Sequence, residues 1–232
     1  MLSQLDINTH STFQVLRQLQ SAIGFDLTGK NVLAIGSHDF LEHDGFVHYG
    51  ANDIIAIECN PNVIPDLLER TKDREKTCVI NTALWSESGI EKEFHFFKDK
   101  KYGAGSLYSN GKLDKYVPDC KELQETIKLN TSTFDSIMQD LNDYFIFDFD
   151  LNNIGWVSLD VQGSELEVLK GAKTLMEAKP EVFYTEVSWD NLYEGAPLIQ
   201  EIDDFFLAHN YVRIGLRQDI QVQGDAIYVQ SK

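Results

Sequence analysis

The stretch IGWVSLDVQGSELEVLKGA, Ile154–Ala172, contains the transition that decides the fold. An apolar run opens it and ends at Asp160, which predicts a buried strand. The spacing of the leucines behind the run predicts one helix over 163–176, and Ser164 and Glu167 fit a capping box at its start. A strand followed directly by a helix is the repeating unit of an α/β protein.

The same alternation extends along the rest of the 232 residues. Apolar runs predict strands at 31–36, 53–58, 77–81 and 181–187, with an extra or edge strand at 93–97. Apolar residues spaced by three and four predict helices at 13–23, at 61–70 with Pro61 in its first turn, at 132–141 and at 197–209. A short polar link between 211–216 and 226–230 predicts a closing antiparallel hairpin. We therefore expect one α/β domain.

The composition is that of an acidic globular protein, with 20 basic and 37 acidic side chains and a formal charge of −17. This charge disfavours nucleic acid and anionic membrane surfaces as partners, because both require basic groups. A small cationic ligand, or an anion bound by backbone amides, stays open. No apolar stretch suits a transmembrane helix, and the amino terminus lacks the pattern of a secretory signal. The three cysteines have no CxxC spacing, so we expect reduced thiols and a cytoplasmic protein.

The segment 98–121, KDKKYGAGSLYSNGKLDKYVPDCK, interrupts the alternation. It is rich in glycine, lysine, tyrosine and serine, and it forms a locally basic region in an acidic protein. A loop of this length inside a compact domain is usually functional or disordered. Two interpretations stay open, a solvated insertion and a lid over the site.

Polar residues follow the predicted strands where a ligand is expected, since ligands of open parallel sheets bind beyond the carboxyl ends of the strands. Gly36, Ser37, His38 and Asp39 follow the first strand, and Glu58 ends the second. A glycine lets the backbone approach a ligand, and an acid about 20 residues further on accepts hydrogen bonds from ribose hydroxyls. The pattern favours a nucleoside-type cofactor, although a tight turn and a solvent-facing acid also account for it.

This pattern alone is compatible with a nicotinamide dinucleotide and with S-adenosylmethionine. The turn lacks the GxGxxG triplet that brings a pyrophosphate to a helix amino terminus. The closing hairpin and the single domain, which leaves little separate substrate-binding structure, also favour S-adenosylmethionine. We therefore expect S-adenosylmethionine as the cofactor.

LDVQGSELEVLKGA resembles the signature of the FkbM-type S-adenosylmethionine-dependent methyltransferases, in which an acid and a glycine precede an E-x-x-x-L-x-G-A helix. Further segments follow in the order of that family: NVLAIGSHD, IAIECNP, NTALWSESG, GAGSLY, TSTFDSIM, PEVFYTEV and GDAIYV. The resemblance implies a Rossmann-like methyltransferase fold, α/β with a mostly parallel central sheet, helices on both faces and a C-terminal antiparallel hairpin. We expect that domain over 30–232, behind an N-terminal helical extension over 1–29.

The resemblance also implies roles for individual residues in methyl transfer, most often to an oxygen. The cofactor-binding residues that it implies, from the methionine end through the ribose to the adenine, are Gly36, Ser37, His38, Asp39, Glu58, Asn81, Ala83 and Leu84. Asp160 would face the methionine moiety or the acceptor. Two positions depart from the family pattern, since Phe40 stands where a second glycine is usual and Gln162 where glutamate is common.

Methyl transfer to a hydroxyl needs an aligned nucleophile, a base for its proton and exclusion of water. We expect Asp160 as the catalytic acidic group, with His38 as the second candidate. The acceptor-binding residues that we expect are Ser106, Glu186, Trp189 and Tyr193. Aromatic rings beside carboxylates suit a sugar or another polyhydroxylated ring, although the same rings can simply pack a loop onto the domain.

The histidines His38, His43 and His48 lie among acids, which are ordinary metal ligands. A spacing of five residues turns a helix by about 140°, so the three would not share one face. We therefore expect no metal site, either there or as a magnesium ion at Asp160.

The leading hypothesis is an O-methyltransferase that uses S-adenosylmethionine and acts on a small or glycan-type acceptor. The alternative is a methyltransferase-like module that binds a ligand without turnover, because of Phe40 in the cofactor loop. An NAD-dependent oxidoreductase is less favoured.

Overall fold

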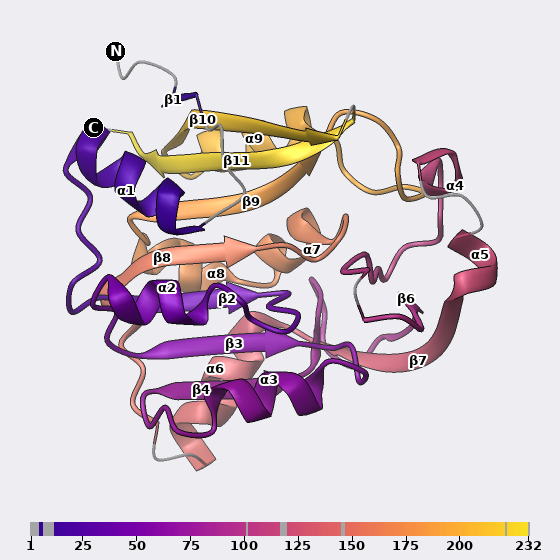
Figure 1. Cartoon of the computed structure of the whole chain (residues 1–232), viewed down its shortest axis with the longest axis horizontal. Coiled ribbons are helices and arrows are strands. Elements are labelled where there is room, and N and C mark those ends of the chain that lie inside the picture. The colour runs from indigo at the N-terminus through magenta and orange to yellow at the C-terminus, as the bar shows by residue number, and fades with distance from the viewer. Residues whose placement is uncertain are drawn as a thin grey trace.

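The central feature of the computed structural model is an eight-stranded sheet with helices on both faces (Figure 1). The structure describes residues 5–6, 12–100, 102–116, 120–144, 147–220 and 222–231. The strand order is β1-β10-β11-β9-β8-β2-β3-β4. The bounds of these strands are β1 Leu5–Asp6, β2 Asn31–Ile35, β3 Ile54–Glu58, β4 Thr77–Asn81, β8 Ile154–Leu159, β9 Val182–Ser188, β10 Tyr211–Ile220 and β11 Gln223–Gln230.

The directions of the strands confirm the predicted α/β fold with its closing hairpin. β4, β3, β2, β8 and β9 run parallel, whereas β11 runs antiparallel to both β9 and β10. The chain builds outward from β2 through β3 to β4, and later from β8 to β9 on the other side. The carboxyl ends of β2 and β8 therefore form the point where the strand order reverses, which is where open α/β sheets bind ligands.

Alternating residues of β2 pack on opposite faces of the sheet. Leu33 and Ile35 belong to the core under α6, α7, α8 and α9, whereas Val32 and Ala34 belong to the core under α1, α2 and α3. A strand buried on both faces reads as a continuous apolar run, and this explains why its position was predictable. The helices are α1 Thr12–Ile23, α2 His43–His48, α3 Ile64–Thr71, α6 Phe134–Tyr144, α7 Glu165–Lys170, α8 Lys173–Ala178 and α9 Ile199–Ala208, with a 3-10 turn at Leu151–Asn153.

A second, three-stranded sheet lies beyond the carboxyl edge of the large one. It consists of β5 (Ala83–Leu84), β7 (Gln124–Ser132) and β6 (Glu91–Phe97), in that order. In Figure 1, β6, β7 and the short helices α4 (Leu113–Tyr116) and α5 (Cys120–Leu123) lie on the side toward which the arrowheads of β3 and β8 point. β6 confirms the strand predicted at 93–97, whereas β7 was not predicted, because QETIKLNTS is mostly polar and forms a strand by pairing with β6.

The prediction of one helix over 163–176 is wrong. α7 ends at Gly171, where a glycine is required because a Cβ would lie 2.2 Å from the carbonyl oxygen of Trp85. The Asp135 carboxylate then accepts hydrogen bonds from the backbone of Lys173 and Thr174, at 3.1 and 3.0 Å, and so caps the amino terminus of α8. The segment therefore forms two short helices, α7 and α8, with a new start at Lys173.

The predicted capping box at Ser164 is also wrong, since the Ser164 side chain makes no capping hydrogen bond. The Glu165 carboxylate folds back onto the turn before α7, where its Oε1 accepts from the backbone nitrogens of Val161 and Gly163, at 3.0 and 3.2 Å. Glu167 instead accepts from Ser86 and Lys170.

The helix expected from Pro61 begins at Ile64, with Pro65 in its first turn. In the predicted helix at 197–209, which the structure has as α9, the apolar Leu207 is 65% exposed. In the part of the chain that the structure describes, no helix has the length and apolar character that would let it span a bilayer.

Candidate active site

A cavity of about 440 Å³ opens at the carboxyl edge of the large sheet. Residues at the ends of β2, β3 and β8 and just beyond them line it, together with Tyr184 and Glu186 within β9 and residues from β6, from β11 and from the segment between β6 and α4. The polar lining includes Ser37, His38, Asp39, Glu58, Asp160, Gln162, Ser164, Glu186 and Asp225. The cavity therefore coincides with the reversal of strand order, where a ligand is expected.

A glycine is required at position 36, because the backbone of Asp160 lies against it at the floor of this cavity. Its φ is +74°, and a Cβ would lie 1.7 Å from the carbonyl oxygen of Asp160. The backbone nitrogen of Asp160 donates to the carbonyl of Ile35 at 3.0 Å, which holds the two strand exits together. The packing of the two strand exits thus requires a glycine here, in addition to the close approach of a ligand that the sequence suggested.

Phe40, which stands where the family pattern usually has a second glycine, has a backbone conformation that glycine adopts freely. Its φ is +54°, in the left-handed region that a glycine adopts freely. Such a conformation costs an ordinary residue about 1–2 kcal/mol, and the burial of the ring, which is 1% exposed against Phe46 and His43, offsets that cost. The loop therefore retains a glycine-like turn.

Glu58 forms an acidic corner of the cavity held by the main chain. Its Oε1 accepts hydrogen bonds from the backbone nitrogens of Cys59 and Asn60, at 2.8 and 2.7 Å, and its Oε2 accepts from that of His38, at 2.8 Å. Burial raises the pKa of Glu58, and the backbone donors lower it in part. The carboxylate ties the loop after β2 to the turn after β3.

Of the predicted adenine-binding residues, two line the cavity and one does not. Ala83 and Leu84 lie on its wall, where they follow the turn after β4. Asn81 is not part of the lining, and its side chain donates to the backbone carbonyl of Glu58 at 2.9 Å. Its observed contact therefore supports the Glu58 corner.

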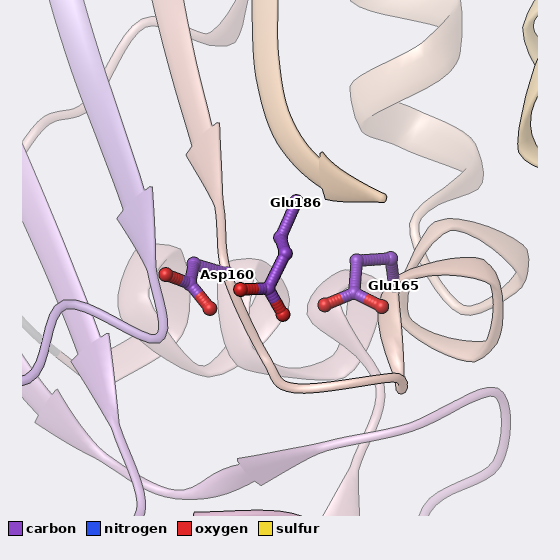
Figure 2. Close-up of side chains that lie close together, drawn as sticks. All are labelled: Asp160, Glu165 and Glu186. Atoms are coloured by element: carbon purple, nitrogen blue, oxygen red, sulfur yellow. The ribbon is translucent and has the colours of Figure 1, made fainter. Parts of the chain in front are cut away.

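A second acidic corner gathers three carboxylates at the ends of β8 and β9. One oxygen each of Asp160, Glu165 and Glu186 lies within 4.8 Å of the other two (Figure 2). In Figure 2 the Glu186 carboxylate lies between those of Asp160 and Glu165. Carboxylates this close disfavour one another's ionised form.

The electrostatics of this corner follow from burial and mutual repulsion. Asp160 is open to the cavity but surrounded by protein, and this poor solvation raises its pKa to about 8. Burial likewise raises the pKa of Glu165 to about 7. Burial and then the charge of Asp160 raise the pKa of Glu186 well above its ordinary value. The corner therefore holds protons at neutral pH that isolated acids would have released.

Gln162 joins two of these acids. Its Nε2 donates to Asp160 Oδ1 at 2.7 Å and to Glu186 Oε1 at 2.9 Å. The residue is 8% exposed and also lines the cavity. Gln162, which departs from the family pattern, is thus in direct contact with Asp160, the acid that the sequence indicated as catalytic.

Of the four predicted acceptor-binding residues, one lines the cavity and three do not. Glu186 lines the cavity, whereas Ser106, Trp189 and Tyr193 do not. Ser106 Oγ donates to the backbone carbonyl of Gln162, and the Tyr193 hydroxyl donates to Gln162 Oε1, both at 2.7 Å. Ser106 and Tyr193 therefore contact the site through Gln162.

The segment after β6 covers one side of the cavity. Lys100, Gly103, Gly105 and Leu107 are part of its lining. Lys100 pairs with Asp66 at 2.7 Å, so this lysine is tied to α3. Within the predicted 98–121 segment, residues 101 and 117–119 lie outside the described part of the chain. The covering position fits the lid interpretation.

The three neighbouring histidines are dispersed. His38 lines the cavity, His43 Nε2 is 2.9 Å from Thr77 Oγ1, and His48 packs against Phe13. Among the described residues, the group with the composition of a metal site is the Asp160 corner instead.

Sequence reasoning missed Asp225, which also lines the cavity. Its carboxylate accepts from Arg217 Nε at 2.7 Å and from the Tyr184 hydroxyl at 2.9 Å. The antiparallel pairing places Asp225 opposite Glu186, at the carboxyl end of β9. The polar link predicted around 221–225 concealed it, because β11 begins earlier than its apolar run.

Comparison with known proteins places this geometry in a family. Residues 34–213 match the family model described as the methyltransferase FkbM domain. The solved FkbM methyltransferase of Methylobacillus flagellatus KT has a TM-score of 0.54 and 15% identity over 87% of this chain and 43% of that chain. This chain thus spans less than half of that protein's length. No curated protein matches the sequence.

Two further solved methyltransferases are similar at lower scores. The precorrin-6y C5,15-methyltransferase of Geobacter metallireducens GS-15 has a TM-score of 0.49 and 10% identity over 99% of this chain and 94% of that chain. The magnesium protoporphyrin IX methyltransferase (ChlM) of Synechocystis PCC 6803, solved with bound S-adenosylmethionine, has a TM-score of 0.46 and 9% identity over 94% and 79%.

Proposed function

The chain belongs to the FkbM methyltransferase family, and from that premise we propose that it transfers a methyl group from S-adenosylmethionine to a hydroxyl oxygen of a small or glycan-type acceptor. The observation that carries the proposal is the cavity at the reversal of strand order, which brings the loop after β2, Glu58 and Asp160 onto one wall.

The cavity wall has the donor and acceptor groups that such a cofactor needs. Within the described residues, Ser37 Oγ, Ser164 Oγ and His38 Nε2 are buried without a hydrogen-bond partner, and all three residues line the cavity. Buried polar atoms of this kind ordinarily have partners, which a polar ligand would provide. The residues that would hold the cofactor are Gly36, Ser37, His38, Asp39, Glu58, Ala83 and Leu84.

The acids suit the charge of the cofactor. Bound S-adenosylmethionine supplies an electrophilic methyl group on a positively charged sulfur. Glu58 and Asp160 both face the cavity, and an ionised carboxylate favours a nearby cation. An acidic wall therefore suits this cofactor, as the overall acidity of the chain allows.

Asp160 is the group that we assign as catalytic base. It opens onto the cavity, and a pKa raised to about 8 by burial makes its ionised form a better proton acceptor than an ordinary carboxylate. It would accept the proton that the acceptor hydroxyl loses. Glu186 would bind acceptor hydroxyls beside it, and His38, on the same wall, is the second candidate base.

Calorimetric titration of the protein with S-adenosylmethionine tests the cofactor. We expect saturable binding that Glu58→Gln weakens. A well-folded protein without detectable binding would contradict the proposal and favour a methyltransferase-like module with another ligand.

Asp160→Asn tests the base. We expect a fall in methyl transfer of about 10²- to 10⁴-fold with retained folding, measured with hydroxylated acceptors and radiolabelled cofactor. Unchanged turnover would remove Asp160 from the mechanism. A product methylated on nitrogen or carbon would contradict the proposed O-methyl transfer.

A further inference from the structure

We propose that Gln162 is a positioning residue for the proposed methyl transfer: it donates one amide hydrogen to each of Asp160 and Glu186, and so sets whether this carboxyl pair is charged or protonated near neutral pH. The inference deepens the proposed function and rests on it for the role of Asp160 as base. The protonation of the two carboxylates can be measured in the cofactor-free protein, separately from methyl transfer.

The first observation is the use of both amide hydrogens. Gln162 Nε2 donates to Asp160 Oδ1 at 2.7 Å and to Glu186 Oε1 at 2.9 Å. A hydrogen bond to the ionised form of an acid stabilises that form. One side chain therefore favours ionisation of both carboxylates and holds them at a fixed separation.

The second observation fixes the orientation of the amide. Gln162 Oε1 accepts from the Tyr193 hydroxyl at 2.7 Å, and Tyr193 is 2% exposed. When both acids are ionised, a reversed amide would turn its carbonyl oxygen toward two carboxylates that have no proton to donate. The hydrogen bond from Tyr193 therefore favours the orientation that directs the amide hydrogens at the ionised acids.

The third observation is that the backbone of Gln162 is held as firmly as its side chain. Its φ is +52°, an unfavourable conformation for a residue other than glycine. Ser106 Oγ donates to its carbonyl oxygen at 2.7 Å, from the segment that covers the cavity. Strained backbone persists where the surroundings determine it, and it gathers at functional sites.

The surroundings make these two hydrogen bonds decisive, because the charges around the pair are mainly negative. Glu165 on α7, Asp225 on β11 and Glu42 before α2 all disfavour ionisation of Asp160. Glu165 and Asp225 do the same to Glu186. The other titratable or charged groups around this part of the cavity are His38 and Asp39 after β2, Tyr184 on β9, Tyr193 after β9, and Arg217 on β10, whose guanidinium is engaged by Asp225.

The same contacts occupy one oxygen of each acid, Asp160 Oδ1 and Glu186 Oε1. A cation bound to Asp160 Oδ1 and Glu186 Oε1 would have to displace the amide nitrogen that already bridges them. Gln162 supplies the positive end of a dipole where a cation would supply a charge. A glutamate at this position, as is common in the family, would add a further acid instead.

Two substitutions separate the donors from the size of the side chain. Gln162→Met keeps the length and removes both donors, whereas Gln162→Glu replaces them with another acid. The matched controls are Gln200→Met and Gln200→Glu, because Gln200 is exposed on α9 and donates to a surface carboxylate, Asp204, at 3.0 Å. Circular dichroism establishes that each variant folds.

The first readout is infrared titration of protonated carboxyl groups in the cofactor-free protein, with Asp160→Asn and Glu186→Gln to assign the band. In both Gln162 variants we expect the midpoint to rise by about one pH unit or more, with no change in the Gln200 variants. Tyr193→Phe keeps Gln162 but frees its amide, and it should shift the midpoint the same way by less. An unchanged midpoint in a folded Gln162 variant would overturn the proposal.

The second readout compares S-adenosylmethionine with S-adenosylhomocysteine, which lacks the positive charge on sulfur. The preference for the charged ligand should increase with pH as Asp160 and Glu186 ionise. In the Gln162 variants this increase should occur at a higher pH than in the parent protein. A preference that follows the same pH profile in all variants would contradict the proposal. If neither ligand binds, the proposed function fails, while the infrared titration still decides the role of Gln162.

Discussion

Two acidic corners of one cavity are built in opposite ways. Glu58 is held by three backbone amides, from His38, Cys59 and Asn60. Asp160 is held by the side-chain amide of Gln162, which it shares with Glu186. Backbone donors persist whichever side chains the turn carries, whereas a side-chain donor disappears with one substitution. The fold itself therefore fixes the first corner, and a single residue can retune the second.

The glycine that joins the two corners should give the largest effect. Gly36→Ala places a Cβ against the Asp160 carbonyl in a left-handed backbone, so we expect a loss of about 3 kcal/mol or more in the free energy of unfolding. Gly89→Ala is the control, since Gly89 also has a positive φ but nothing within 4 Å of an added Cβ, and it should cost about 1–2 kcal/mol. Urea denaturation measures both, and equal losses would show that the packing of the two exits does not matter.

A substitution at Glu58, whose carboxylate is held by backbone donors, should lower the free energy of unfolding more than one at the Asp160 corner, which is held by a side chain. Glu58→Gln replaces one of the two accepting oxygens with an amide nitrogen, so at least one backbone N–H donor loses its acceptor, which should cost about 1–3 kcal/mol. Glu177→Gln, at an exposed position on α8, is the matched control for the lost charge. If both variants unfold at the same urea concentration, the backbone donors do not stabilise the corner.

The Asp160 corner should make stability depend on pH. The pKa values of Asp160, Glu165 and Glu186 lie above their ordinary values, so the folded protein keeps protons that the unfolded chain releases first. The contribution of these acids to the free energy of unfolding is fully present below about pH 4, where they are protonated in both states. It is lost as the pH rises toward about 8.

Glu186→Gln should lessen this loss, measured as the difference in unfolding free energy between about pH 5 and about pH 8. Glu177→Gln should leave the difference unchanged. A Glu186→Gln variant with the same dependence as the parent protein would show that the corner is already ionised at the lower pH.

The smallest effect should come from Tyr193→Phe, which removes the hydrogen bond to Gln162 Oε1 and leaves the ring in place. We expect a cost of about 0.5–1.5 kcal/mol in stability, and a smaller change in the titration of the acids than the Gln162 variants give. A larger change than theirs would mean that Tyr193 acts on the acids by another route.

The sequence predicted the frame of the molecule well. Apolar runs located β2, β3, β4, β8 and β9. Continuous runs are expected for strands buried on both faces, such as β2 and β3, whereas β4 is an edge strand that is only partly buried. The closing hairpin and the position of Asp160 at a strand end followed from the same runs. The division of the chain at residue 29 stays a prediction, and α1 of that first part packs on the sheet through Val15, Leu16 and Leu19.

The elements that the sequence missed depend on partners distant in the chain. β7 is polar and exists through its pairing with β6, and the break between α7 and α8 lies where Trp85 packs against Gly171 and Asp135 caps α8. Local periodicity contains no information about such contacts. The same limit explains why Asp225 and Glu165 were missed, since the tertiary structure brings Asp225 to the cavity and Glu165 to the carboxylates of Asp160 and Glu186.

By itself, the sequence determined an α/β chain with acids at its strand exits and a signature that placed it in its family, because burial periodicity and turn chemistry are local. Only the tertiary structure decided what each acid meets there. It gave Glu58 three backbone donors and gave Asp160 one amide shared with Glu186. The state of a carboxylate depends on the charges and donors around it, and at Asp160 these include Asp225 and Glu42, which are remote in sequence.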